Sequence, residues 1–417
     1  MATISWNATS TSDLDKVWRI VQLQLAEAFN FVTEEWDILS NKVPRLRINL
    51  SARQMILPLD IQEDYGVASI PENGWEAVPV SPNVVDSEFT WITLHKRFAL
   101  SRTARHLDKG GNSAAMVMKQ IRYQGMKAVQ ALKRRIGDYF YGYGTAYVCK
   151  VSAIGSDILT PKDLYTVSGL GTVVDWVRIF KVGDRVGVLN PSGPALRGTA
   201  AITAINASTG ALTLASTPGS TAADDLVVFA NSVEDNTLAQ TDYNGGLTGL
   251  LDANLSTSLQ SVSGTTYPNW TSGYTDSASG RFGTIELRKG RQGVKNKGGG
   301  DLDVLLMDQG VENDIVAGLR GGLRFSSAFN MEIDGSPSAK GVTIMSTQRV
   351  PDGYVFGWVK ANSIAKIQLL EGLDTPGWDE AEKVPNRASF VFPMDWPCQM
   401  VYKNRGNLAI WYNKTAQ

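Results

Sequence analysis

Few residues in this sequence have the type and spacing that catalysis would need. His95 and His106 are the two histidines, and no serine lies in the G-x-S-x-G turn of a hydrolase. Asp301 and Asp303 are two residues apart on a predicted strand, so they would share a face and could form an acid/base pair or bind a metal. Alternatively, this pair only marks a strand that enters from a loop.

Other groups that could bind a ligand are equally weak. Cys149 and Cys398 lie far apart, which argues against a zinc site or a disulfide scaffold. Three glycines at 298–300 precede a predicted strand and not a helix, so they do not resemble a phosphate-binding loop. A basic run could contact phosphate or could be a solvated helix face. Its members are Arg288, Lys289, Arg291, Lys295 and Lys297. We therefore expect no enzyme, cofactor or metal, and an assembly or structural role.

Composition sets wider limits. The chain has 417 residues, 43% of them hydrophobic, which is enough for two or three compact units. Its formal net charge of −1 predicts no global attraction to nucleic acid. Its N-terminus lacks the regions of a secretion signal, and it has no apolar run of about 18 residues. We expect a soluble protein made in a reducing cytosol, without a membrane partner.

The most regular pattern is a predicted long helix at 111–142. Asn112 or Ser113 can cap its start. Apolar or small residues then recur every three or four positions, which places them on one face. They are Met118, Ile121, Gly125, Ala128, Leu132, Ile136 and Tyr139. Basic side chains, among them Arg122, Lys133 and Arg134, fall mostly elsewhere. The helix could be the long central support on which the rest of the domain packs, or an ordinary amphipathic helix on a sheet.

A second helical pattern covers residues 12–40. Its apolar stripe contains Trp18 and Trp36 at nearly heptad spacing. Such a stripe needs a partner surface, which could be the core of its own chain or a neighbouring subunit.

After the second helical pattern, the spacing and type of the apolar residues change to those typical of strands. Residues 53–61 and 88–100 are rich in β-branched, aliphatic and aromatic residues and predict strands. Between them, Asn73-Gly74 and three prolines predict a long, loosely paired excursion at a sheet edge. Long loops of this kind usually serve binding. Trp75 and Val78 in this loop would be costly to leave in water.

The rest of the chain alternates between β and α patterns. Residues 145–154 predict a strand, and 157–234 predict a small antiparallel barrel or sandwich with Gly-containing turns. A basic helix, a buried strand at 301–308 and a second helix follow, and several strands end the chain. This order predicts an α+β protein with several subregions.

The order of these elements resembles the major capsid proteins of tailed bacteriophages, which have the Hong Kong 97-type fold. The residues that carry the resemblance are the extended segment WEAVPVSPNVVDSEFTWITLHKRFALSRTA (75–104), the long helix, the segments GGLTGLLDA (245–253) and YPNWTSGY (267–274), and the closing MVYKNRGNLAIWY (400–412). The resemblance covers most of the chain and is architectural.

The resemblance implies a division of the chain into six regions. They are an N-terminal arm at 1–43, an extended β-loop at 44–105, a peripheral domain with its spine helix at 106–156, an inserted β-module at 157–234, an axial domain at 235–350 and returning strands at 351–417.

It also implies a function. We expect a coat protein that self-assembles as pentamers and hexamers into an icosahedral shell around double-stranded DNA, in the virion and assembled in the host cytoplasm. Scaffold, portal and decoration proteins are possible partners. Expected interface anchors are Trp18, Trp36, Trp75, Val78, Trp91 and Trp270, and expected DNA-facing residues are Arg122, Lys133 and Arg134. Other readings remain open, namely a tail tube protein, an adhesin or a hydrolase that uses Asp301 and Asp303.

Overall fold

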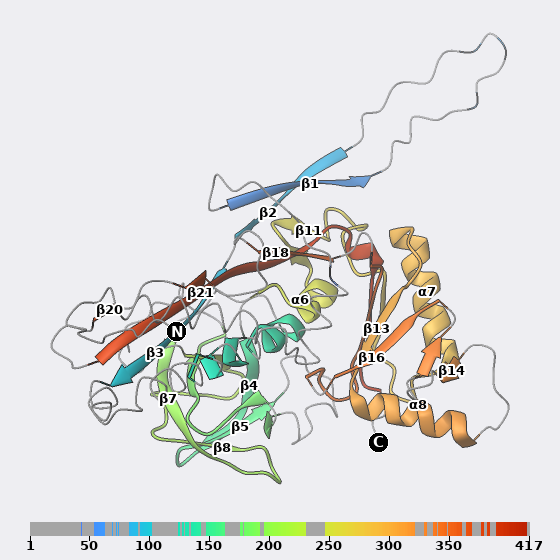
Figure 1. Ribbon diagram of the computed structural model, residues 1–417. Coiled ribbons are helices and arrows are strands. Elements are labelled where there is room, and N and C mark those ends of the chain that lie inside the picture. Colours follow the sequence, from blue (N-terminus) through green and yellow to red (C-terminus); the bar gives the residue numbers. More distant parts are fainter. Residues whose placement is uncertain are drawn as a thin grey trace, which may run out of the picture. The chain divides into compact units, whose positions relative to one another are not determined.

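The fold is described from a computed structural model (Figure 1). It describes residues 43, 54–62, 69, 72, 74, 83–90, 92–101, 124–125, 127–128, 130–132, 135–142, 147–162, 176–177, 179–191, 196–230, 247–321, 329–331, 337–339, 341–347, 349–360, 364–368, 377–378, 382–383 and 389–414. The chain divides into two compact units. One contains Met1–Asn41, Trp91–Gly137 and Gln368–Cys398, and the other contains Lys42–Thr90, Asp138–Ile367 and Gln399–Gln417.

The larger unit is built on a mixed five-stranded sheet. Its strand order is β12 (Tyr274–Asp276), β22 (Leu408–Trp411), β17 (Val355–Trp358), β13 (Val304–Met307) and β16 (Thr343–Ser346). The two outer pairs are parallel and the inner pairs antiparallel. All residues of β13, β17 and β22 are buried, because both faces of the sheet are covered.

Two helices supply one cover of this sheet (Figure 1). Helix α7 (Thr284–Gly298) contributes Leu287 and Val294, and α8 (Gln309–Gly321) contributes Val311 and Ile315. They pack in one cluster with alternate sheet residues, including Leu305, Met307, Val355 and Trp411. On the opposite face, Tyr141 stacks on Phe356 with ring centroids 6.5 Å apart. The predicted basic helix is therefore confirmed. The strand predicted at 301–308 is present and buried but shorter, at Val304–Met307.

Local sequence explains where α7 and α8 begin and end. The Glu286 carboxylate accepts from Gly283 N–H at 3.0 Å, and Gly299 ends α7 in the left-handed region at φ 72°. For α8, the buried Asp308 carboxylate accepts from Gly310 N–H at 2.9 Å, as an N-cap residue does.

Short elements complete this part of the larger unit. They are helix α6 (Leu250–Leu255), the hairpin β10 (Ser258–Leu259) and β11 (Val262–Ser263), the pair β14 (Phe329–Met331) and β15 (Pro337–Ala339), and the 3-10 turn η3 (Arg405–Asn407).

A closed antiparallel barrel also belongs to the larger unit. Its strands, in the order in which they pair, are β4 (Tyr147–Gly155), β5 (Ile158–Lys162), β8 (Leu212–Leu214), β7 (Leu196–Ile205), β6 (Arg185–Leu189) and β9 (Leu226–Phe229). The interior is filled by aliphatic side chains together with Trp176 and Phe180. The β-rich pattern thus forms a barrel. Its predicted start at 157 is wrong, because β4 pairs with both β5 and β9.

A two-stranded ribbon precedes the barrel in the chain. It consists of β1 (Gln54–Gln62) and β2 (Asn83–Thr90), which pair antiparallel from Gln54–Thr90 to Gln62–Asn83. The first strand predicted to flank the long loop, 53–61, is therefore confirmed as β1. The second, predicted at 88–100, is wrong in its bounds, because β2 begins at Asn83 inside the predicted loop and a separate strand, β3, covers Ile92–Ser101. Most of the loop between them, with Trp75 and Val78, lies outside the described residues.

The smaller unit contains one antiparallel sheet around the long strand β21 (Ser389–Tyr402). It pairs with β3 (Ile92–Ser101), and also with β19 (Gly377–Trp378) and β20 (Glu382–Lys383). Strand β21 continues into the larger unit after Cys398, and β18 (Ile364–Gln368), which also pairs with β21, belongs to the larger unit except for Gln368.

Of the long helix predicted at 111–142, the structure describes residues from 124 onward. The described residues from 124 to 141 are helical, and Gly125, Ala128, Leu132, Ile136 and Tyr139 are all buried, as the periodicity predicted. The predicted N-terminal helix at 12–40 lies outside the described residues.

Gly290 lets α7 pack closely on the sheet. A Cβ atom at Gly290 would lie 2.0 Å from Cζ2 of the buried Trp411. We predict that Gly290→Ala lowers the free energy of unfolding by about 1–3 kcal/mol, because helix and ring must separate. Gly155→Ala is the matched control, since no atom lies within 4 Å of its Cβ position. Urea unfolding measures both, and equal losses would contradict the packing argument.

Candidate functional site

Two of the exposed large apolar side chains that the structure describes lie on the β1–β2 ribbon. Ile56 is 60% exposed and Val84 54% exposed, and Pro58 between them is also exposed. These residues alternate with Leu57, Leu59, Val85 and Phe89, which face the other way and are buried or half-buried. The ribbon thus has an attached inner face and an exposed outer face. On the outer face the apolar residues Ile56, Pro58 and Val84, which we call the ribbon face, lie among the exposed Asp86 and Glu88.

The inner face is held by the hairpin β10–β11 and the segment after it. Leu59 packs with Val262 and Trp270, and Glu88 N–H donates to Gln260 O at 3.1 Å. Gln260 and Ser261 both have positive φ, 53° and 63°, as a tight two-residue hairpin turn requires.

Gln260 also ties this hairpin to the end of β21. The Gln260 side-chain amide donates its N–H to Tyr402 O at 2.8 Å, and its oxygen accepts from Tyr402 N–H at 3.1 Å; these two bonds fix the orientation of the amide. The base of the ribbon is therefore fixed to the larger unit by backbone and side-chain bonds.

The open edge of β1 is poorly suited to strand addition. Glu88 N–H of β2 points away from β1, so its cross-strand partner Ile56 points its own N–H and C=O away from β2, to the open edge of β1. Because this direction alternates along a strand, the backbone of Pro58 also points to the open edge. Proline has no N–H to donate there. A partner is therefore expected to contact the ribbon face and not to extend the sheet.

The predicted carboxylate pair is not assembled as a site. Asp301 and Asp303 precede β13 and are not part of it, so the expectation that they share a strand face is wrong. The Arg291 guanidinium donates to both Asp301 oxygens, at 3.0 and 2.6 Å, and lowers the pKa of Asp301. The Asp303 carboxylate accepts from Lys360 N–H at 3.0 Å. Both carboxylates therefore have structural partners.

The predicted interface and DNA-facing residues fall mostly outside the described part of the chain. This applies to Trp18, Trp36, Trp75, Val78, Trp91, Arg122, Lys133 and Arg134. Trp270 is described and is only 2% exposed, and its Nε1 donates to Leu259 O at 3.2 Å. The structure does not support an interface role for Trp270, because its ring presents almost no surface to another subunit.

The described residues offer neither a metal site nor a membrane-spanning helix. They contain no group of three or more His, Cys, Asp and Glu side chains arranged to hold a metal. Within the same residues, no helix is long and apolar enough to cross a membrane.

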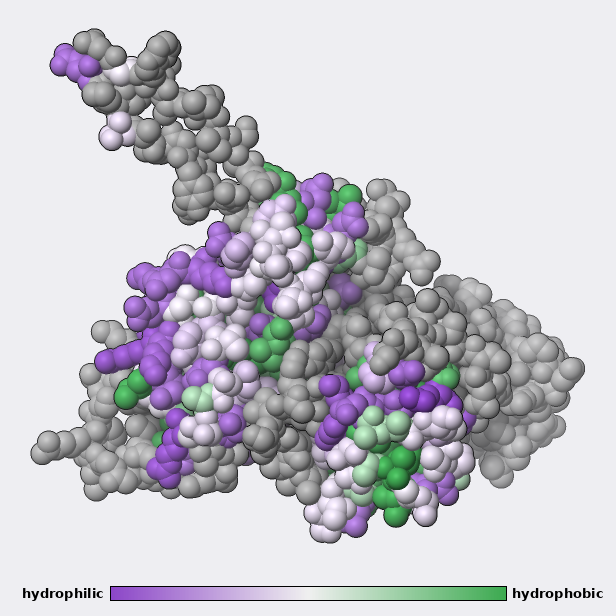
Figure 2. Space-filling view, turned by 180° about the vertical axis from the view of Figure 1, so that it is seen from behind, coloured by the Kyte–Doolittle hydropathy of each residue, from purple (hydrophilic) through white to green (hydrophobic). Residues whose placement is uncertain are grey.

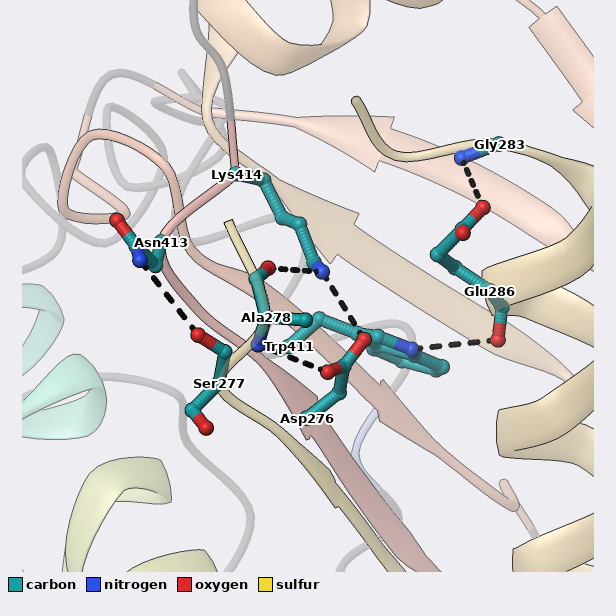
Figure 3. A network of polar contacts seen from close by, with 8 residues as sticks. All are labelled: Asp276, Ser277, Ala278, Gly283, Glu286, Trp411, Asn413 and Lys414. Carbon is teal, nitrogen blue, oxygen red and sulfur yellow. Dashed lines mark hydrogen bonds and ion pairs between the residues drawn. The ribbon is translucent and has the colours of Figure 1, made fainter. Parts of the chain in front are cut away.

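A buried ion pair fastens the end of β22 to β12 (Figure 3). Lys414, 2% exposed in its side chain, donates to the Asp276 carboxylate at 2.9 Å and to Ala278 O at 2.7 Å. Burial alone would raise the pKa of Asp276, but hydrogen bonds from Ala278 N–H and Lys414 outweigh it and lower that pKa. Nearby, Trp411 Nε1 donates to Glu286 O at 3.3 Å, which links β22 to α7.

A fully buried arginine joins two further segments, the end of α6 and Trp270. Arg405 donates to Ala253 O at 2.8 Å, to Ser256 O at 2.6 Å and to Trp270 O at 2.9 Å. Burial lowers the pKa of Arg405 to about 10, so it stays protonated at neutral pH. No spacing in the sequence marked this residue, because its partners are backbone carbonyls.

Comparison with known proteins identifies the fold. No family model and no curated protein matches the sequence. Among solved structures, the chain is similar to the capsid asymmetric unit of cyanophage A-1(L), with 13% identity, 93% of this chain and 95% of that chain covered, and a TM-score of 0.52. The chain has the fold of a tailed-phage major capsid protein.

Two further solved structures are similar to this chain at lower TM-scores. They are the holo-SrpI encapsulin of Synechococcus elongatus PCC 7942 (10% identity, 93% and 90% covered, TM-score 0.46) and the capsid of a native GTA particle (10% identity, 92% and 92% covered, TM-score 0.45). In the capsid fold of this chain, the mixed sheet and the paired ribbon are the parts that the structure describes most fully.

The Lys414–Asp276 pair gives a pH-dependent prediction. Lys414→Met should lower the free energy of unfolding by about 3 kcal/mol at pH 7, because a buried carboxylate loses its cation. Since the folded pKa of Asp276 is lowered, the pair stabilises the fold above about pH 4, and this stabilisation is lost as pH falls through the lowered pKa. The variant and the parent should therefore converge in acid.

Urea unfolding at several pH values measures this difference. Arg291→Met is the control, because the exposed Arg291–Asp301 pair should contribute only about 0–1 kcal/mol. A loss for Lys414→Met that does not change with pH would contradict the assignment.

Proposed function

We propose that this chain is a major capsid protein that self-assembles through many subunit contacts into an icosahedral shell around a double-stranded DNA genome. The observation that carries the proposal is the likeness to the cyanophage A-1(L) capsid asymmetric unit along 93% of the chain. In this proposal the chain is a structural component of the virion, assembled in the host cytoplasm as pentamers and hexamers.

The ribbon supports a role in assembly. A shell subunit must contact several neighbours, and each contact must stay weak enough for assembly errors to reverse. Residues of the ribbon face would otherwise leave about half or more of their apolar side chains in water. Because the base of the ribbon is already fixed, the ribbon loses less conformational entropy when a neighbour binds the ribbon face.

The regions of the resemblance remain part of the proposal. Residues 1–43 would form the N-terminal arm, and the barrel would be an insertion into the capsid fold. Trp18, Trp36, Trp75, Val78 and Trp91 are proposed anchors between subunits. DNA contact is assigned to Arg122, Lys133 and Arg134, and scaffold, portal and decoration proteins are proposed partners.

Expression of the chain alone tests the class of protein. We expect closed shells, capsomer rings or polymeric sheets in negative-stain electron microscopy, with fast-sedimenting material in ultracentrifugation. Co-expression with candidate scaffold and portal proteins is the second condition. A monomer in both conditions would contradict the proposal.

Substitutions on the ribbon face test the contact. Ile56→Asp and Val84→Asp should prevent or strongly reduce assembly, because a carboxylate would be buried at the interface. The isolated subunit should change its stability by no more than about 0.5 kcal/mol, since both side chains are exposed. Ile285→Asp on α7 is the matched control, because Ile285 is 63% exposed on another element. Normal shells from the ribbon variants would rule out the ribbon face as an interface.

A further inference from the structure

The structure divides the basic run of helix α7 into two groups. Arg291 is bound to the Asp301 carboxylate, and Lys297 is half-buried and donates to Ser272 O at 3.1 Å. These two cations therefore have structural partners within the chain. The other three, which are exposed, are Arg288, Lys289 and Lys295. The choice between a phosphate contact and a solvated helix face therefore concerns only these three side chains.

The three cations lie on one side of α7, together with two amides. Because a helix turns about 100° per residue, positions 288, 289, 292, 295 and 296 fall within a sector of about 120°. The opposite side, with Leu287, Gly290 and Val294, is buried against the sheet. We call the exposed residues of this sector the α7 outer face, and they are Arg288, Lys289, Gln292, Lys295 and Asn296.

No carboxylate of the described residues neutralises the α7 outer face. Among those residues, none of its three cations lies within ion-pair distance of an acidic group. Glu286 caps the first turn of the helix instead. The carboxylates of Asp276 and Asp301 are affected by Lys289 and Lys295 only at longer range, because each already has an ion pair of its own. The α7 outer face is therefore a local positive surface on a chain whose net charge is −1.

The composition of the α7 outer face fits a phosphate backbone better than a protein surface. Protein–protein interfaces have an apolar centre and few lysines. Phosphate oxygens of nucleic acids are contacted mainly by Arg and Lys, and also by Asn and Gln. The α7 outer face has one Arg, two Lys, one Gln and one Asn, and Ile285 in the first turn is the one exposed large apolar side chain of α7.

Other parts of the larger unit have a different surface. Figure 2 shows apolar side chains among nearly neutral ones over the barrel, whereas hydrophilic side chains gather at the left of the view, on the side of the larger unit where α7 lies. The positive surface is therefore a feature of α7 and not of the whole unit.

The length and rigidity of α7 suit a DNA backbone. Arg288 and Lys295 are two turns apart, which is about 10 Å along the helix axis. Since B-DNA carries one phosphate per about 3.4 Å of axis on each strand, this length faces about three phosphates. The helix itself is fixed to the sheet through Gly290 and through the bond from Trp411 Nε1 to Glu286 O at 3.3 Å. Only side chains would lose freedom when phosphates bind.

We propose that the α7 outer face binds the phosphate backbone of double-stranded DNA without reading its base sequence. The inference rests on the proposed function, which supplies the DNA, and it adds a DNA contact on the larger unit. Three phosphate contacts give weak, salt-dependent binding, which can hold a packaged genome close to a shell and still let it move.

Salt dependence of DNA binding tests the contact. We would measure the affinity of the full chain for a fluorescent DNA duplex by anisotropy, between about 50 and 200 mM NaCl. Arg288→Gln, Lys289→Gln and Lys295→Gln together should weaken binding at the lower salt concentration by about tenfold or more. They should also reduce the slope of log affinity against log salt concentration by about 3, because about one counterion is released per phosphate neutralised.

Lys181→Gln is the matched control, because Lys181 is an exposed lysine on the barrel of the same unit. It should leave the slope unchanged. All variants should keep the thermal unfolding midpoint of the parent, since the replaced side chains are exposed. A triple variant whose slope falls no further than that of Lys181→Gln would overturn the inference.

Lysine labelling in particles tests whether packaged DNA is the partner. With an amine-reactive reagent, Lys289 and Lys295 should react several-fold less in DNA-filled particles than in empty shells, while Lys181 reacts equally in both. Equal reaction of Lys289 and Lys295 in filled and empty particles would overturn the inference. Protection that is already present in empty shells would mean that a neighbouring subunit covers the α7 outer face, which also overturns it.

The two levels of proposal fail separately. The salt titration uses the free chain and needs no particles. A parent chain that forms no particles, alone or with candidate scaffold and portal proteins, contradicts the proposed function whatever the slope. Normal shells from a triple variant whose slope equals that of the parent contradict only the DNA contact of α7.

Discussion

The larger unit depends on a buried cation that has only backbone carbonyls as hydrogen-bond partners. Arg405 is 0% exposed and binds carbonyls at the end of α6, just after it and at Trp270. A charge in a low-dielectric interior is costly unless its donors are satisfied, and three short bonds supply that compensation here. Since helix ends expose carbonyls with partial negative charge, the C-terminus of α6 suits a guanidinium. The end of α6, Trp270 and the segment that contains Arg405 must therefore lie together before Arg405 can be buried.

Residues next to Arg405 extend this arrangement in two directions. Toward α7, the Asn404 side chain donates to Gly298 O at 3.3 Å, and the Asn407 side chain accepts from Gly300 N–H at 3.2 Å. Toward the ribbon, Tyr402 binds Gln260, which accepts from Glu88 N–H. The segment 402–407 thus connects the helix that covers the sheet to the base of the ribbon. The ribbon can project an apolar face because these contacts fix the inner one.

The sequence predicted what depends on local pattern and missed what depends on distant partners. Periodicity placed Ala128, Leu132, Ile136 and Tyr139 on the buried face of a helix, and turn residues marked the barrel. Asp301 and Asp303 were misread because the arginine that binds Asp301 lies ten residues upstream on α7. Trp270 was read as an anchor between subunits because an aromatic residue among turn formers gives no sign of a core beneath it. Arg405 gave no signal, since any surface arginine has the same sequence context.

These contacts fit the proposed assembly, in which a stable subunit would make weak contacts with many neighbours. Buried groups such as Arg405 and Lys414 hold their partners through several hydrogen bonds each, so their segments move as one body. The ribbon face instead exposes single aliphatic side chains on paired strands. Such surfaces lose little entropy on binding and gain only a small apolar contact each. A structure that needs many neighbours at once favours this combination, because the sum of the contacts is strong while any one of them can still dissociate.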